Sequence, residues 1–278
     1  MPDADFHLHS TCSDGADAPA EVMRRATRHG LGAVALTDHD TCAGNAEAAQ
    51  AATVLGLTYV HGVEVSTRFE PLELHVIALS AQPWPASFAA ALESSMQWRH
   101  DRALAIVEQL ESLGLPMKGL RARLAAMEGE IVGRMHIAAY LTEAGVVKKP
   151  QEAFDRWLKP GCPGFVRKEL LNTAAVIDLV HDAGGLAFVA HPGLQKNVRK
   201  TLPVLLELPF DGIEAFHVSH SPGRADEFVQ LAQSRNLLIT GGSDCHGSIK
   251  GQPTMGQSKL PWRHAARLLD ALNDGVNK

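Results

Sequence analysis

Short apolar runs alternate along the chain with longer segments of helical pattern, and this alternation predicts an α/β fold. Runs such as Ala33–Leu36 and Leu186–Ala190 are apolar throughout, which is typical of strands buried on both faces of a parallel sheet. Segments such as Pro19–Gly30, which begin at proline and end at glycine, predict the intervening helices. The expected strands cover residues 5–9, 33–36, 57–65, 72–79, 186–190, 213–216 and 237–240. This order fits either a closed barrel or an open doubly wound sheet.

One pair of expected strands is joined by a short turn instead of a helix. The chain can turn at Arg68–Pro71, so that residues 72–79 return along residues 57–65 as a hairpin. A turn centred near residue 70 places Glu64 almost opposite His75, where cross-strand Cβ atoms are roughly 4.5–5.5 Å apart. We therefore expect these two side chains to lie close together.

The alternation stops between about Pro85 and Pro163, where helical patterns follow one another without a convincing strand. Such a stretch inside an alternating chain predicts a helical insertion. The expected organisation is a first part of the α/β fold at residues 1–97, a helical cap at 98–165 and a second part at 166–278.

Composition excludes several classes of protein. The chain has 278 residues, of which 45% are hydrophobic and 21% charged, and its net charge of -5 excludes a generally basic surface for nucleic acid or anionic lipid. No apolar run approaches the ~18 residues of a membrane helix, and the first residues lack a signal-peptide pattern. The four cysteines form no CxxC pair, which favours a reducing cytoplasm. We expect a cytoplasmic protein that needs neither a membrane nor an obligate protein partner.

Histidine is over-represented, with 14 residues against 2 tyrosines, and histidine is the commonest metal ligand in proteins. Most of the metal-competent side chains lie at the C-terminal end of an expected strand or in the loop just after it. They are His7, His9, Asp14, His39, Glu64, His75, His191, Asp244 and His246. A closed barrel gathers all of its strand ends at one face, whereas an open sheet brings only a few together. The placement therefore favours a barrel with a metal centre, although any one of these histidines alone is more often structural.

The motifs around these residues resemble the PHP family, named for polymerase and histidinol phosphatase. They are His7-x-His9 with Asp14, Thr37-Asp38-His39, Gly62-Val63-Glu64, His75, His191-Pro192-Gly193 and Gly242-Ser243-Asp244-Cys245-His246-Gly247. The resemblance covers roughly residues 5–80 and 165–250. It implies a distorted (β/α)7 barrel of the amidohydrolase-like group that holds two or three divalent ions. None of the nine positions departs from the family pattern, which argues against a metal-free binding module.

The resemblance also implies how the ligands are shared. The implied sets are His7, His9, Glu64 and Asp244 for one ion; Glu64, His75 and His191 for a second; and Asp14, His39 and His246 for a third. Six imidazoles and three carboxylates without a thiolate suit manganese first, with iron or zinc as alternatives. Paired ions suit phosphate-ester hydrolysis, because they stabilise the attacking and leaving oxygens together. The residues expected to take part in catalysis are Asp14, His39, Glu64, His191 and Asp244.

In its length and its helical insertion, the chain resembles the PHP subgroup that removes the 3′-phosphate from 3′,5′-bisphosphonucleosides such as pAp. Arg99 and Arg102 share a helix face, and Arg134 begins another helix, so these three arginines are candidates to bind a second phosphate. Alternatively, these arginines are ordinary solvent-exposed surface residues. The same two interpretations apply to Arg167 and Lys168.

His217 ends an expected strand outside the nine motif positions. It is a candidate both to contact the substrate phosphate and to donate a proton to the leaving group, with a structural histidine as the alternative. The competing activities are a 5′-3′ exoribonuclease acting on short RNA and a histidinol-phosphate phosphatase.

Overall fold

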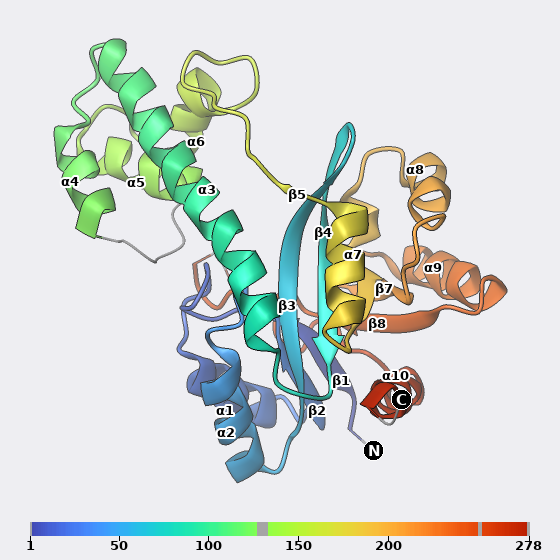
Figure 1. Ribbon diagram of the computed structural model, residues 1–278. Helices are drawn as coiled ribbons and strands as arrows, with labels where there is room; N and C mark the ends of the chain where they lie inside the picture. Colours follow the sequence, from blue (N-terminus) through green and yellow to red (C-terminus); the bar gives the residue numbers. More distant parts are fainter. Residues whose placement is uncertain (1, 127–132, 250–251, 277–278) are drawn as a thin grey trace. The chain divides into compact units, whose positions relative to one another are not determined.

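The computed structural model describes residues 2–126, 133–249 and 252–276, which form two compact units. The barrel unit consists of Met1–Ala91 and Leu171–Lys278, and the helical unit of Leu92–Leu170. Figure 1 shows the elements of both units along the chain. Residues 127–132, which belong to the helical cap expected at 98–165, lie outside the described residues.

The barrel unit is built on one eight-stranded sheet, which confirms the predicted barrel-like α/β class. Its strands run in the order β1-β2-β3-β4-β6-β7-β8, and a short β5 pairs only with β3. The bounds are β1 Ala4–Leu8, β2 Ala33–Leu36, β3 Thr58–Phe69, β4 Leu72–Ser80, β5 Leu171–Asn172, β6 Leu186–Val189, β7 Gly212–His217 and β8 Leu238–Gly242. Sequence analysis missed only the two-residue β5, which is too short to show a pattern.

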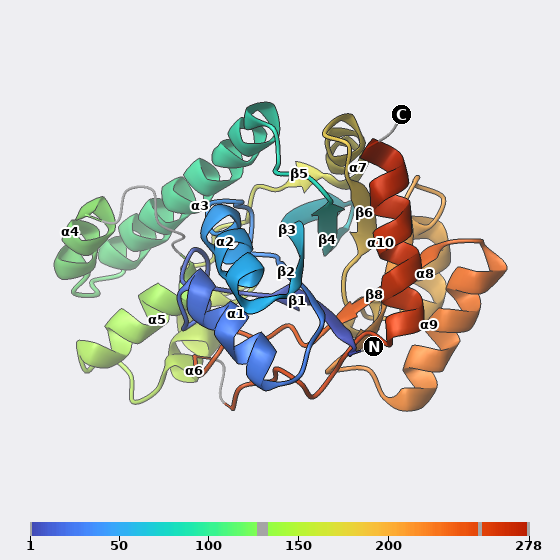
Figure 2. The same cartoon turned by 90° about the horizontal axis from the view of Figure 1, so that it is seen from below.

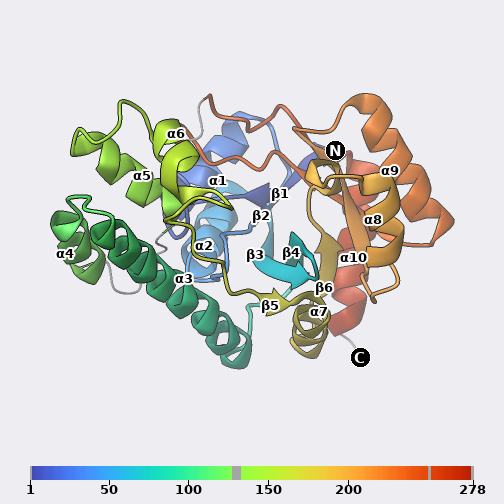
Figure 3. The same ribbon diagram turned by 90° about the horizontal axis from the view of Figure 1, so that it is seen from above.

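The sheet curves until its two edges meet. Leu8 at the end of β1 forms a parallel bridge with Cys245, just past β8, and the N–H of His9 donates to the carbonyl of Cys245 at 3.0 Å. Figures 2 and 3 show the strands at the centre of the barrel unit with its helices outside them. The ends of β1 and β8, and the residues that follow them, are therefore neighbours.

β3 and β4 form the expected antiparallel hairpin, but its register differs from the prediction. Ser66, not Glu64, pairs with His75, and Glu64 pairs with Ile77. Glu64 and His75 are thus diagonal neighbours on one face of the sheet, because side chains two residues apart along a strand point the same way. Their side chains still meet, with Glu64 Oε1 2.7 Å from His75 Nδ1.

The outer helices of the barrel unit pack on the apolar outer face of the sheet. They are α1 Pro19–Arg28, α2 Asn45–Leu55, α7 Thr173–Asp182, α8 Val198–Leu205, α9 Pro222–Ser234 and α10 Trp262–Val276. Buried residues of α1 and α2, among them Met23 and Ala48, pack against Leu8 and Leu36 of the strands. This packing fixes the strands whose ends carry the first candidate ligands.

The helical unit has a hydrophobic core of its own, with Leu110, Leu124, Ile137 and Leu158 buried together. Its elements are α3 Ala86–Ser112, which begins in the barrel unit, α4 Lys118–Ala126, α5 Arg134–Glu143, α6 Pro150–Ala153 and the π-helical turn Phe154–Leu158. In the part of the chain that the structure describes, no helix combines the length and apolarity that a membrane crossing requires.

Candidate metal centre

Most of the nine predicted ligands lie near the end of a barrel strand or in the loop that follows it, whereas Glu64 and His75 lie within the β3–β4 hairpin. His7 is in β1 and His9 just after it, His39 follows β2, and Asp244 follows β8. His39 and Glu64 also form a parallel bridge, which joins the end of β2 to the middle of the long β3. The structure therefore brings side chains from most of the barrel strands to one place.

One group of four consists of His7, His9, Glu64 and Asp244, whose potential ligand atoms all lie within 4.8 Å of one another. Both His7 Nε2 and His9 Nε2 lie 3.2 Å from Glu64 Oε2, and His9 Nε2 lies 3.1 Å from Asp244 Oδ1. The group has the same membership as the first ligand set that the family resemblance implies.

The other oxygen of Glu64 faces a second set of histidines. Glu64 Oε1 lies 2.7 Å from His75 Nδ1 and 2.8 Å from His191 Nε2. His39 also approaches Glu64, with Nδ1 3.0 Å from Oε2, so that His39, Glu64 and His75 form a group. One buried carboxylate thus touches both of the first two implied sets, as a bridging ligand would.

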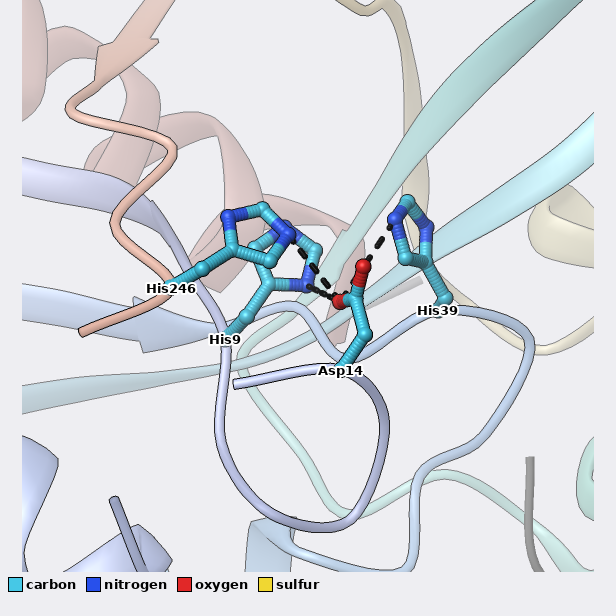
Figure 4. A group of neighbouring side chains, drawn as sticks. All are labelled: His9, Asp14, His39 and His246. Atoms are coloured by element: carbon cyan, nitrogen blue, oxygen red, sulfur yellow. Dashed lines mark ion pairs between the residues drawn. The ribbon is translucent and has the colours of Figure 1, made fainter. Parts of the chain in front are cut away.

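A third group lies around Asp14, in the loop after β1 (Figure 4). Asp14 Oδ1 lies 3.0 Å from His246 Nε2, 3.8 Å from His39 Nε2 and 3.9 Å from His9 Nδ1. The rings of His9 and His246 are stacked, with centroids 4.0 Å apart. His9 therefore touches both this group and the group at Asp244.

The donor atoms at the centre suit a cation. His7 Nε2, His39 Nδ1 and Glu64 Oε2 are buried and have no hydrogen-bond partner among the residues that the structure describes. A buried polar group without a partner is costly, so such atoms are expected to face a ligand. Nitrogen and carboxylate donors without a thiolate are those that manganese, iron and zinc accept. The residues present therefore fit divalent metal ions.

The carboxylates of the centre are held in the charged form. Burial by itself raises the pKa of Glu64, but His39, His75 and His7 outweigh it and hold the pKa well below its usual range. Burial also raises the pKa of Asp244, whereas His7 and His217 lower it, and the net shift is again downward. Both groups are thus anionic ligands near neutral pH.

The candidate ligands differ in their exposure to solvent. Glu64 is only 1% exposed, whereas the side chains of Asp14 and His75 are each 32% exposed and that of Asp244 is 23% exposed. A substrate would therefore meet Asp14, His75 and Asp244 before the buried bridge at Glu64.

Two of the candidate ligands have unusual backbone conformations. His191 has φ of 26° and Asp244 has φ of 49°, in the region that residues other than glycine seldom adopt. Strain of this kind concentrates at functional sites, where surrounding contacts hold it in place. Here the contacts come from buried carboxylates that sequence analysis missed.

Three carboxylates next to the ligands, Asp5, Asp38 and Glu214, are fully buried, and of these only Asp38 stands in one of the sequence motifs. Asp5 accepts hydrogen bonds from Ser243, the neighbour of Asp244, and burial raises the pKa of Asp5 to about 6. Asp38 accepts from the backbone N–H and the hydroxyl of Ser10, at the start of the loop that carries Asp14. Asp5 and Glu214 are charged residues inside otherwise apolar strands. This pattern in the sequence could have indicated that they have a role at the site.

His217 lies beside the centre, buried at the end of β7. Its Nδ1 accepts the backbone N–H of Ser219 at 3.1 Å, so the neutral ring carries its proton on Nε2. That Nε2 lies 3.4 Å from Asp244 Oδ2. The ring can thus present a proton on the side of the candidate ligands.

The three candidate arginines belong to the helical unit. The Nε of Arg102 donates to the carbonyl of Val166 at 2.8 Å, and Nη1 of Arg134 donates to the carbonyl of Leu158 at 3.1 Å. Arg99 is half-buried on α3. Each guanidinium has five N–H donors, so these contacts still leave donors for a phosphate. Phosphate binding by the three arginines stays a prediction.

Comparisons with known proteins agree with this geometry. The PHP domain family model matches residues 5–160. A 3′,5′-nucleoside bisphosphate phosphatase of Chromobacterium violaceum is 34% identical over 97% of this chain and 99% of its own. A 5′-3′ exoribonuclease of Haemophilus influenzae is 35% identical over 87% of this chain and 89% of its own. A crystal structure from Bifidobacterium adolescentis, described as a metal-dependent phosphoesterase, matches with a TM-score of 0.81 and 29% identity over 98% of each chain.

Proposed function

Because this chain belongs to the PHP domain family and is a metal-dependent phosphoesterase, we propose that it hydrolyses the 3′-phosphate of 3′,5′-bisphosphonucleosides, converting pAp to AMP and phosphate. The observation that carries the proposal is the similarity to the bisphosphate phosphatase over 97% of this chain and 99% of that relative. The matched region includes the helical unit, where a feature that selects the substrate is expected.

The nine candidate ligands are proposed to hold two or three ions, with manganese as the native metal. When bound, divalent ions supply positive charge to the attacking and leaving oxygens of the phosphate ester. Glu64 is proposed to hold two of the binding positions together, because its two oxygens face different histidines. Asp14 and His75, whose side chains are each 32% exposed, are proposed to face the substrate phosphate.

His217 is proposed to donate a proton to the departing 3′-oxygen of the nucleoside. The acid form of the ring is the imidazolium, which becomes a neutral imidazole when Nε2 gives up its proton. In that form Nδ1 also carries a proton, and Ser219 Oγ, 2.7 Å away, can accept it. A proton donated in this way leaves the product as an alcohol instead of an alkoxide, which makes the departure easier.

The 5′-phosphate is proposed to bind the arginines of the helical unit, Arg99, Arg102 and Arg134. A guanidinium binds phosphate through two parallel hydrogen bonds, which gives orientation as well as affinity.

A 5′-3′ exoribonuclease is the second candidate, favoured by the similarity to the Haemophilus influenzae relative. That activity would need a track for several nucleotides, preferably with stacking aromatic side chains. The aromatic content of 5% and the net charge of -5 favour a small substrate over a long strand.

The experiment compares kcat/KM for pAp, a 5′-phosphorylated tetraribonucleotide and histidinol phosphate, with Mn²⁺ added and the products separated by chromatography. We expect pAp to be the best substrate and AMP to be its product. Adenosine 3′-phosphate as the product, or a higher kcat/KM on the tetranucleotide or on histidinol phosphate, would overturn the proposal. The purified Glu64→Gln variant reports any contaminating phosphatase.

A further inference from the structure

Glu214 is a buried carboxylate that belongs to none of the three ligand sets implied by the family resemblance. It lies in the middle of β7, is 0% exposed and contacts two of the candidate ligands at once. Its Oε1 lies 2.8 Å from His7 Nδ1, and its Oε2 accepts the backbone N–H of His191 at 2.5 Å. His7 and His191 belong to different implied ligand sets, so Glu214 contacts one member of each of the two sets.

The contact with His7 determines which nitrogen of that ring faces the centre with a lone pair. An ionised carboxylate only accepts hydrogen bonds, so His7 Nδ1 must carry the proton that is shared with Glu214. In the neutral ring the lone pair is then on Nε2, which lies 3.2 Å from Glu64 Oε2 and 3.5 Å from Asp244 Oδ1. Two acceptor oxygens and one lone pair therefore face each other, an arrangement that a cation satisfies.

The contact with His191 holds a backbone that is otherwise unfavourable. His191 has φ of 26° and ψ of 57°, and its N–H would have no strand partner in this conformation. Glu214 accepts that N–H, while His191 Nε2 lies 2.8 Å from Glu64 Oε1. The carboxylate thus supports the position of His191 as well as the tautomer of His7.

We propose that Glu214 is a positioning residue that tunes two metal positions together, through the His7 tautomer and the His191 backbone. The inference rests on the metal centre proposed above and not on the identity of the substrate. Carboxylates behind ligating histidines fix the ring orientation and the tautomer, and their loss costs about 10–100-fold in metal affinity.

The Glu214→Gln variant separates this role from simple packing, because the two side chains have nearly the same shape. A carboxylate accepts both hydrogen bonds, whereas an amide has only one acceptor. If the amide oxygen accepts from His191, the amide NH₂ faces His7 Nδ1, and the His7 proton must move to Nε2. If the amide turns over, the NH₂ faces the N–H of His191 instead. Either way, one of the two candidate ligands is disturbed.

A matched control lies on the neighbouring strand. Thr240 of β8 is in register with Glu214, is equally buried, and its Oγ1 has no hydrogen-bond partner among the described residues. Thr240→Val keeps the volume of the side chain and touches neither His7 nor His191 by any hydrogen bond. It measures the general cost of changing a polar residue in the barrel interior.

The test titrates metal-free protein with Mn²⁺ by calorimetry, without substrate, and counts bound ions by atomic absorption. We expect about 10–100-fold weaker binding in Glu214→Gln and unchanged binding in Thr240→Val, with both folded by circular dichroism. Equal affinity in Glu214→Gln and wild type would overturn the positioning role, whatever the substrate of the enzyme. A wild-type protein that binds no ion would overturn the metal centre on which it rests.

A second measurement uses the wild-type protein, so it does not depend on the variant folding. Nitrogen-15 NMR of the Zn²⁺-loaded protein, with the His7 signals assigned through a His7→Gln sample, reports which ring nitrogen carries the proton. A proton on His7 Nδ1 supports the proposal. A proton on Nε2 contradicts it, because the lone pair would then face Glu214.

Discussion

Glu64 and His191 are 127 residues apart in the sequence, and yet Glu64 Oε1 lies 2.8 Å from His191 Nε2. The whole helical unit lies between them in the chain, since that unit covers Leu92–Leu170. Neither part of the barrel unit can therefore build the candidate centre alone. The centre forms only when β3, from the first part, and β6, from the second, join the same sheet.

Loss of the carboxylate at this contact should abolish turnover without unfolding the protein. We expect Glu64→Gln to lower kcat on pAp by at least about 10²-fold, because a neutral amide cannot supply two anionic donors to two metal positions. Glu73→Gln, in the same hairpin but with a side chain 56% exposed, is the control. Near-normal turnover of Glu64→Gln, measured by phosphate release, would contradict the proposed catalytic role.

Removal of divalent ions should inactivate the enzyme and lower its thermal stability. The buried Glu64 and the partly exposed Asp244 carry negative charge, and a bound cation would satisfy both. At free Mn²⁺ near 100 times the dissociation constant, the free energy of unfolding should rise by about 2.7 kcal/mol. Scanning calorimetry of the chelator-treated protein, before and after Mn²⁺ is returned, measures the shift. An unchanged Tm together with unchanged activity would contradict metal dependence in this chain.

His217 should affect the chemical step and not the binding of metal. We expect His217→Gln to lower kcat by about 10²–10⁴-fold, the usual contribution of a positioned general acid. The number of bound ions should stay the same, because His217 belongs to none of the three implied ligand sets. If atomic absorption instead finds one ion fewer, His217 acts as a ligand beside His7 and Glu214, a group whose ligand atoms also lie close enough to hold a metal ion.

Arg99 should distinguish substrates by their second phosphate. Loss of a charge-assisted hydrogen bond costs about 1.5–3 kcal/mol, so Arg99→Ala should raise KM for pAp by about 10–100-fold. KM for adenosine 3′-phosphate, which lacks the 5′-phosphate, should not change. Arg121→Ala is the control, since Arg121 lies in the same helical unit and pairs with Glu111 at 2.8 Å on the surface. An equal change in KM for both substrates would show that Arg99 does not bind the 5′-phosphate.

The sequence by itself determined the strands, the outer helices, the helical insertion and the strand-end positions of the nine candidate ligands. These features follow from local periodicity and from turn residues, which are visible without knowledge of the fold. It was also enough to indicate His7-x-His9, because alternate residues of a strand point the same way.

Only the tertiary structure decided which atoms meet. The register of β3 and β4 pairs Ser66 with His75, and it makes Glu64 a diagonal neighbour of His75 instead of its direct partner. The partners of Asp5 and Glu214 lie 238 and 207 residues away, at Ser243 and His7, so no local pattern could reveal them. Closure of the sheet between Leu8 and Cys245 brings such distant groups together, because it places the first and last strands side by side.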